Sequence, residues 1–270
     1  MCAFLKSGRG VILCVIIMVF LAAACFAIGA WPSSGDKIRT SNGLTVDYSN
    51  ASDGYVIVHA APSDSRLKLR VTCGDVTYTY DLNSEGEDEI FPLQLGRGEY
   101  KFTLYRNISG NKYSRKADVK VKVEIKDKNS AFLYPNQYVN YTEDSPAVKM
   151  SDEICRGLET DREKVDAITK YVSENYLYDY VRAVTISSGY LGDIDGCFDK
   201  KMGICQDLAA LTACMLRAQG IPTKLEIGYA GNIYHAWNSV LVDGEYERLD
   251  ITSRLKGLNS KQEYTVERVY

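Results

Sequence analysis

The sequence predicts an α+β fold in which an antiparallel β-sandwich-like region precedes a region of helices packed on an antiparallel sheet. Three observations support this prediction. Short segments of alternating polar and apolar residues fill positions 45–128. Two segments with helical periodicity follow, at 160–175 and 203–222. An Asp-Gly pair at 243–244, between two strand-like segments, then indicates a β-hairpin.

Residues 1–30 differ in composition from the rest of the chain. Lys6 and Arg9 precede a segment without charges that runs from Val11 to Ala30. It has the length of a membrane-spanning helix, about 20 residues, and the charge pattern of a signal peptide. In both cases the remainder is exported, so we expect an extracellular or cell-surface protein, which would be membrane-anchored if the segment is not cleaved. A third alternative, from LAAAC at 21–25, is lipidation of Cys25.

The first folded region is expected at residues 45–128, after a linker at 31–44 that is rich in Ser, Gly and Pro. Segments such as YVIVHAA, LKLRVTC and ADVKVKVEI alternate between polar and apolar residues, and turn residues separate them. Turns every eight to twelve residues are typical of a sandwich or barrel. His59 has no nearby Cys or acidic partner in the sequence, and we interpret it as structural. A second linker is expected at 129–149.

The first helix is expected to begin at a capping box formed by Thr160 and Glu163. In this motif the two side chains satisfy backbone N–H groups that the helix itself leaves free. The pattern predicts that the helix ends near Asn175. Its apolar face would consist of Val165, Ile168 and Val172.

The second helix, in GICQDLAALTACMLRAQGIP, is expected to carry a reactive cysteine. Gly220 and Pro222 provide its stop signal. Cys205 lies at the front edge, where free N–H groups and the helix dipole stabilise a thiolate. Cys214 lies nine residues further on and is interpreted as a core residue. The apolar stripe would consist of Leu208, Leu211, Met215 and Leu216.

The hairpin around Asp243-Gly244 brings an acid close to a histidine. With these two residues as the turn, His235 would face Thr252, and Asp250 would be its diagonal neighbour on the same side of the sheet. Such neighbours lie about 7–8 Å apart at the backbone. Asp250 could then orient His235, and Cys205 would complete a Cys–His–Asp arrangement.

Three segments resemble the transglutaminase-like superfamily, in particular its exported bacterial members. They are KVDAITKYVSENYLYDY, GICQDLAALTACMLRAQGIPTKLEIGYAG and YHAWNSVLVDGEYERLD. The resemblance covers roughly residues 150–270. It implies a papain-like catalytic domain, in which the helix that begins with the cysteine packs against an antiparallel sheet that bears the histidine and the acid.

The resemblance also implies a role for each matched residue. Cys205 would be the nucleophile, His235 the general base and Asp250 the orienting acid. Tyr178, in YLYDY, matches a recurrent tyrosine near the site and would support it or bind an oxyanion. The sequence departs from the family pattern after the acid, where Ile251 stands in place of proline. That change affects backbone rigidity and leaves the chemistry intact.

The resemblance and these residues together imply acyl transfer from protein or peptide amides through a thioester on Cys205. With export, the resemblance also leads us to expect substrates of the cell surface or cell wall. A lysine amine as acceptor would make the protein a transglutaminase, and water would make it a cysteine protease or amidase. One alternative is a non-catalytic binding or scaffolding module with the same fold, and another is a β region that itself binds cell wall.

Composition excludes several other classes of function. The net charge of −3 gives no reason to expect a nucleic-acid partner. We expect no cofactor and no metal, because a chain with two histidines and no C-x-x-C pair is poorly suited to zinc. The acidic run NSEGEDE at 83–89 could attract calcium, but it lacks EF-hand spacing, so we interpret it as a solvated turn.

Five cysteines follow residue 30, namely Cys73, Cys155, Cys197, Cys205 and Cys214. In an oxidising compartment an odd number leaves at least one thiol unpaired within the chain. Cys197 is interpreted first as a structural thiol. The alternatives are a disulfide with Cys155 or a redox lock on Cys205.

Overall fold

The computed structural model describes residues 33–187, 189–256 and 262–270. The apolar segment at 1–30, with Cys25, lies outside these ranges, so its expected role as signal peptide or anchor stays a prediction. Within the described ranges, no helix combines the length and hydrophobicity needed to cross a bilayer.

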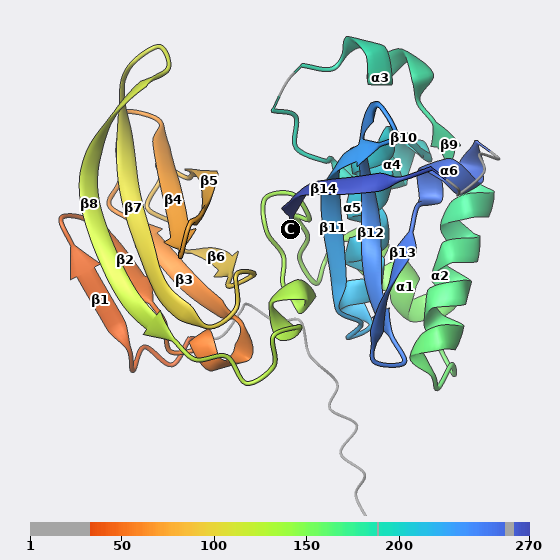
Figure 1. Cartoon of the computed structure of the whole chain (residues 1–270), viewed down its shortest axis with the longest axis horizontal. Helices are drawn as coiled ribbons and strands as arrows, with labels where there is room; N and C mark the ends of the chain where they lie inside the picture. Colours follow the sequence, from red (N-terminus) through yellow and green to blue (C-terminus); the bar gives the residue numbers. More distant parts are fainter. Residues whose placement is uncertain (1–32, 188, 257–261) are drawn as a thin grey trace, which may run out of the picture.

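The N-terminal part contains two four-stranded antiparallel sheets, as the alternating sequence pattern predicts (Figure 1). The first has the order β1-β2-β3-β6, with β1 at Ile38–Ser41, β2 at Leu44–Asp47, β3 at Tyr55–Ala60 and β6 at Glu89–Pro92. The second has the order β5-β4-β7-β8, with β4 at Leu67–Cys73, β5 at Val76–Leu82, β7 at Gly98–Ser109 and β8 at Lys112–Val123. Apolar residues at alternate positions of both sheets join one buried cluster.

Two segments expected to be linkers contain regular structure. Within 31–44, β1 pairs with β2 around Asn42 and Gly43, which both have positive φ as a tight two-residue hairpin requires. The strand β1 is exposed on both faces, so it lacks the alternation by which strands are recognised. Within 129–149, a short 3-10 helix spans Ser130–Leu133 and helix α1 begins at Pro146, a residue suited to the first helical position.

The C-terminal part packs helices against the antiparallel sheet β13-β12-β11-β14 (Figure 1). The strands are β11 at Thr223–Ala230, β12 at Ile233–Val242, β13 at Glu245–Leu249 and β14 at Tyr264–Val269. The helices are α1 at Pro146–Ile154, α2 at Asp161–Asn175, α3 at Tyr180–Thr185, α4 at Ile194–Lys200, α5 at Cys205–Ala218 and α6 at Ile251–Leu255. Two short parallel strands, β9 at Leu177–Tyr178 and β10 at Met202–Gly203, lead into α5.

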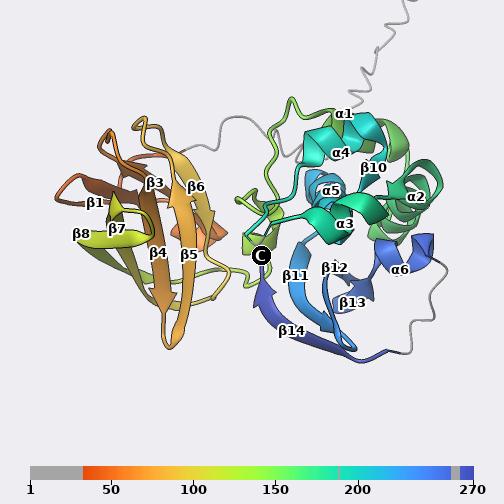
Figure 2. The ribbon, with the colours of Figure 1, turned by 90° about the horizontal axis from the view of Figure 1, so that it is seen from above.

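Helices α2 and α5 begin and end close to the predicted positions. Thr160 and Glu163 form the expected capping box, with the Glu163 N–H 3.2 Å from the Thr160 hydroxyl oxygen. The predicted apolar faces of both helices are buried. Helix α5 lies in the middle of the C-terminal part, between the sheet and the helices α1, α2 and α4 (Figure 2). Its small alanine side chains permit this close packing on several sides.

The hairpin of β12 and β13 has the predicted register, with Val242 opposite Glu245 and Asn238 opposite Leu249. The prediction that the second strand continues to Thr252 is wrong, because β13 ends at Leu249. Asp250 instead caps α6, and its carboxylate accepts a hydrogen bond from the Ser253 N–H at 3.0 Å. This local bond favours a helix start over further strand pairing.

Strand β14 lies on the side of the C-terminal sheet that faces the N-terminal strands (Figures 1 and 2). The Val269 carbonyl accepts a hydrogen bond from Gln94 at 3.0 Å, and the Val269 N–H donates to the Tyr78 hydroxyl at 3.4 Å. Gly228 on β11 permits the close pairing, since a Cβ there would overlap the Thr265 carbonyl oxygen. One strand therefore contacts both halves of the molecule.

Candidate active site

Cys205 is the first residue of α5 and is half-buried. The short strand β10 and the extended residue Ile204 lead into it, so the chain turns sharply from strand to helix at this point. This is where free backbone N–H groups of the helix point outward. The cysteine thus has the position that the sequence predicts.

His235 comes from β12 and connects Cys205 with Asp250. Its Nε2 donates to the Asp250 Oδ2 at 2.9 Å, and its ring also hydrogen bonds with the Cys205 thiol. Because Nε2 is engaged by Asp250, Nδ1 is the ring nitrogen left for the thiol. The structure therefore brings together the three residues that the sequence singles out as a candidate site.

Burial and hydrogen bonding shift the pKa values of His235 and Asp250 in opposite directions. Burial alone would lower the pKa of His235, but its hydrogen bonds to Asp250 and Cys205 raise that pKa from 6.5 to about 9. Burial alone would raise the pKa of Asp250, but the hydrogen bonds from His235 and Ser253 and the charge of His235 hold it well below its usual range. At neutral pH the arrangement favours an imidazolium beside a carboxylate.

Two hydroxyl groups that the sequence did not single out also hold Asp250. The Ser253 Oγ and the Tyr264 hydroxyl each donate to the Asp250 Oδ2 at 2.7 Å. Trp237 is almost fully buried beside them, with its ring 6.1 Å from that of His235 and 4.9 Å from that of Tyr264. The carboxylate is therefore fixed in orientation by α6 and β14 together.

Tyr178 lies next to Cys205, at the end of β9. Its hydroxyl oxygen accepts a hydrogen bond from the Cys205 backbone N–H, and burial raises its pKa to about 12. The ammonium of Lys256 lies 3.6 Å from the centre of the Tyr178 ring. The tyrosine thus contacts the N–H group that would be expected to bind an oxyanion.

Asp207 supports the start of α5 from inside the fold, and the sequence offered only a weak signal for it. Its side chain is fully buried. It accepts hydrogen bonds from the Tyr190 hydroxyl at 2.6 Å, the Asp193 N–H at 3.1 Å and the Ile204 N–H at 3.0 Å. An acid in the first turn of a helix is a common capping residue, and that position was the available clue.

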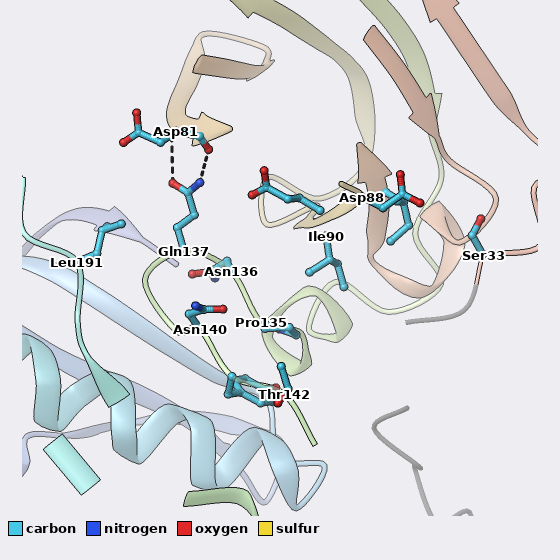
Figure 3. A pocket seen from close by; sticks show the side chains of 13 residues that line it. Ser33, Asp81, Asp88, Ile90, Pro135, Asn136, Gln137, Asn140, Thr142 and Leu191 are labelled. Atoms are coloured by element: carbon cyan, nitrogen blue, oxygen red, sulfur yellow. Dashed lines mark hydrogen bonds between the residues drawn. The ribbon is translucent and has the colours of Figure 1, made fainter. Parts of the chain in front are cut away.

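Cys205 and His235 open into a hollow of about 710 Å³. Helix α3 and the β11–β12 hairpin contribute apolar side chains to its walls, among them Val184 and Ile233. A second hollow, of about 830 Å³, lies beside the connection between the two halves, where Gln137 makes two hydrogen bonds with the Asp81 backbone (Figure 3). None of the three candidate residues lines this second hollow, so it belongs to a different surface.

The remaining candidates are separate from this site. His59 makes an exposed hydrogen bond with the Asp88 carboxylate, with its Nδ1 3.2 Å from the Asp88 Oδ1, so it has an acidic partner that its sequence neighbourhood does not contain. The Asn83 side chain organises the acidic turn at 83–89, because its Oδ1 accepts hydrogen bonds from the N–H groups of Gly86 and Glu87. Within the described residues no three Cys, His, Asp or Glu side chains are grouped as metal ligands would be.

The five cysteines of the described residues are all free thiols. Cys197 and Cys155 do not form a disulfide with each other. Burial raises the pKa of Cys197 to about 12, which keeps it protonated and unreactive. These features favour the structural interpretation of Cys197.

Comparison with known proteins identifies the C-terminal part. Residues 148–251 match the model of the transglutaminase-like superfamily, so this segment is a transglutaminase-like domain. The uncharacterized protein YebA of Bacillus subtilis (strain 168) is 23% identical over 154 residues, which are 54% of this chain and 20% of YebA. The chain thus matches about a fifth of the length of that relative.

Solved structures with similarity to the chain include a protein from Cytophaga hutchinsonii that is named as a candidate cysteine protease. It is 16% identical, with a TM-score of 0.40 over 80% of this chain and 83% of its own. The transglutaminase of red sea bream is 15% identical, with a TM-score of 0.29 over 73% of this chain and 48% of its own.

Proposed function

We propose that the protein is a cysteine-dependent acyl-transfer enzyme that acts on protein or peptide amides. The observation that carries this proposal is the hydrogen-bonded series from Cys205 through His235 to Asp250 at the start of α5. A buried acid, a histidine with a raised pKa and a cysteine at a helix N-terminus are the parts that thiol-based acyl transfer requires.

In the proposed reaction the Cys205 thiolate attacks the carbonyl carbon of the amide, and a tetrahedral intermediate forms. The C–N bond then breaks, and His235 Nδ1 donates its proton to the departing amine. The acyl group remains on the sulfur as a thioester. Asp250 keeps the imidazole oriented and stabilises its protonated form throughout.

The second half of the reaction needs a nucleophile that His235 deprotonates. Water would give a carboxylic acid and restore the thiol, whereas an amine would give a new amide and also restore the thiol. The fold and the site are compatible with both outcomes, so we propose the shared first half as the function. The acceptor then decides between a hydrolase and a transglutaminase.

Tyr178 is proposed to assist at the oxyanion. Its hydroxyl accepts the Cys205 N–H in the absence of substrate, so the substrate oxygen would take over that N–H as the intermediate forms. The raised pKa of Tyr178 keeps its own proton in place. That proton would then be available as a second donor to the negative oxygen.

We further propose that the protein acts outside the cytoplasm. Lys6 and Arg9 followed by the uncharged segment at 11–30 support export. Fractionation of cells that express the full chain, with antibody detection before and after mild protease treatment of intact cells, tests this. A chain protected from protease in unbroken cells and recovered in the cytosol would contradict export.

Thiol reactivity tests the proposed function directly. The protein without residues 1–30 is treated with iodoacetamide between pH 5 and pH 9 under mild reduction, and peptide mapping locates the label. Cys205 should react fastest at and below pH 7, and His235→Ala should slow it at least about tenfold. Cys73 serves as the reference within the same chain, since it is also half-buried and burial raises its pKa.

Detection of the acyl-enzyme completes the test. Incubation with amide-bearing peptides should add the acyl mass to the Cys205 peptide, and water or an added amine should then release it. If Cys205 reacts no faster than Cys73, and if no acyl adduct forms, a non-catalytic module becomes the better interpretation of this domain.

A further inference from the structure

The charged side chains that line the hollow in front of Cys205 are basic. Its lining includes the cationic side chains Lys256 and Arg268, and it includes no Asp or Glu. The other polar residues that line it are mostly tyrosines, together with Ser187, Gln206 and the candidate residues Cys205 and His235. The imidazolium of His235 adds to the positive charge. A partly enclosed surface with one sign of charge attracts ligands of the opposite sign.

Besides His235, Lys256 is a cation in direct contact with a residue of the candidate site. It follows helix α6, and its ammonium rests on the rings of Tyr178 at 3.6 Å and Tyr180 at 5.3 Å. Tyr178 in turn accepts a hydrogen bond from the Cys205 backbone N–H, and Lys256 and Cys205 line the same hollow. The Lys256 ammonium therefore lies near the sulfur that the substrate must approach.

Neither Lys256 nor Arg268 has an acidic partner in the protein. Every Asp and Glu of the chain lies within the described ranges, because residues 1–32, 188 and 257–261 contain none. Among those carboxylates, none lies within ion-pair distance of Lys256 or Arg268. The Arg268 guanidinium instead lies over the Tyr78 ring at 5.3 Å and donates to the Thr77 carbonyl at 3.4 Å.

We propose that the substrate segment seated in this hollow carries a carboxylate close to the scissile amide, and that Lys256 pairs with it while Arg268 adds to the attraction. The carboxylate can come from an Asp or Glu side chain or from a free carboxyl terminus. The pairing positions the amide against Cys205 without adding a group to the reaction itself. The proposal rests on the proposed function of the site and specifies its substrate class.

An experiment on the full chain tests the charge preference without knowledge of the natural substrate. Iodoacetate carries a carboxylate and iodoacetamide is its neutral analogue, and both alkylate Cys205. The rate with iodoacetate divided by the rate with iodoacetamide measures the attraction of the site for an anion. Any change in the reactivity of the thiol itself affects both rates and cancels in this ratio. Lys256→Met should lower this ratio about tenfold, and Lys256→Glu should lower it further.

Controls separate this effect from general charge and from misfolding. Lys200→Met removes an exposed lysine that does not line the hollow, and it should leave the ratio unchanged. Raising the salt concentration should lower the ratio in the unaltered protein and have a smaller effect in Lys256→Met. An unchanged ratio in both Lys256 variants, with Cys205 still reactive, would overturn the proposal.

Peptides then distinguish the two sources of the carboxylate. One series carries Glu beside the cleavable amide with an amidated carboxyl terminus, and the other carries Gln with a free terminus. A preference for either series over a peptide with Gln and an amidated terminus supports the proposal, and the favoured series names the source. If His235→Ala does not slow the alkylation of Cys205, the result counts against the proposed function. Failure of the proposed function and failure of the charge preference are therefore distinguishable.

Discussion

At the residue scale, the Asp250 carboxylate accepts four hydrogen bonds, and only one of them comes from His235. Its two oxygens accept from His235, from the Ser253 hydroxyl and N–H, and from Tyr264. A carboxylate that accepts several bonds remains ionised and cannot rotate freely. The orientation of the imidazole is therefore determined by residues from α6 and β14 that take no part in bond making.

Tyr264→Phe tests this positioning role. Loss of a hydrogen bond to a charged group should reduce the free energy of unfolding by about 1.5 kcal/mol. It should also raise the pKa of Asp250. The acidic limb of the pH profile of Cys205 alkylation should then move to higher pH. Urea unfolding and the pH profile of alkylation measure the two effects. Tyr229→Phe, a half-exposed tyrosine on the neighbouring strand, is the control and should change neither.

The raised pKa of His235 predicts a pH dependence of stability. Because the folded-state pKa is about 9 and the ordinary value is 6.5, the protonated ring stabilises the folded state fully below about pH 6.5. This contribution is lost as the pH rises through about 9. Urea unfolding between pH 6 and pH 9.5 should thus show a smaller loss in His235→Gln than in the unaltered protein. Parallel pH curves for the two proteins would contradict the pKa shift.

At the element scale, the start of α5 depends on a carboxylate inside the fold. Asp207 accepts three hydrogen bonds, one of which, from Ile204, holds the residue immediately before Cys205. The helix thus presents its cysteine from a fixed first turn. Preorganisation of this kind matters because a small displacement of a nucleophile costs much of its rate.

Asp207→Asn tests the dependence of the cysteine on this anchor. The asparagine side chain has one acceptor oxygen in place of two. Its NH₂ group would therefore face at least one of the three groups that now donate to Asp207, and that hydrogen bond would be lost. We expect a loss of about 2 kcal/mol in the free energy of unfolding and slower alkylation of Cys205. Asp161→Asn, in the exposed first turn of α2, should cost less than about 0.5 kcal/mol. Equal effects of the two substitutions would show that α5 is positioned by other contacts.

The sequence predicts elements well where the determining contacts are local. The capping box at Thr160, the cysteine at the start of α5 and the hairpin register around Asp243 all depend on residues a few positions apart. The end of β13 was missed because a side-chain cap at Asp250 outweighs strand alternation. The exposed strand β1 was missed because it has no apolar face.

Support for the candidate site could not be predicted in the same way. Tyr264 reaches Asp250 from another strand, and Tyr190, which precedes α4, reaches Asp207 in α5. Lys256, which follows α6 near the end of the chain, contacts Tyr178 at the end of β9. None of these pairs has a spacing that indicates contact, since each depends on how separate elements pack. The sequence therefore indicates reactive residues more readily than the residues that orient them.

At the scale of the whole molecule, the two halves are joined through the end of β14. Tyr78, on β5, contacts the ring of Tyr270 at 5.5 Å and accepts the Val269 N–H. Arg217, buried in α5, donates to the carbonyls of Tyr134 and Tyr270 and so ties the connecting segment to the same place. The two halves therefore contact each other through polar and aromatic side chains and are not joined by a flexible linker alone.

Tyr78→Ala should weaken this connection. Loss of a buried aromatic ring costs about 3 kcal/mol, and we expect faster amide hydrogen exchange in residues 264–269 as well as a lower unfolding temperature. Tyr105→Ala, which removes a ring of the same size from β7 beside Arg70, is the control. It should leave exchange in 264–269 unaffected. If Tyr78→Ala also leaves that exchange unaffected, β14 is held by its own sheet alone.

Strand β14 makes a different long-range contact at each end. Tyr264, at its first residue, carries the carboxylate beside the histidine, and Val269, at its last, is fastened to the N-terminal sheet. The contact between the two halves and the contact that orients Asp250 are thus made by the same short strand. A change in how the halves pack against each other is therefore expected to alter the position of Tyr264 and, through it, the orientation of the carboxylate.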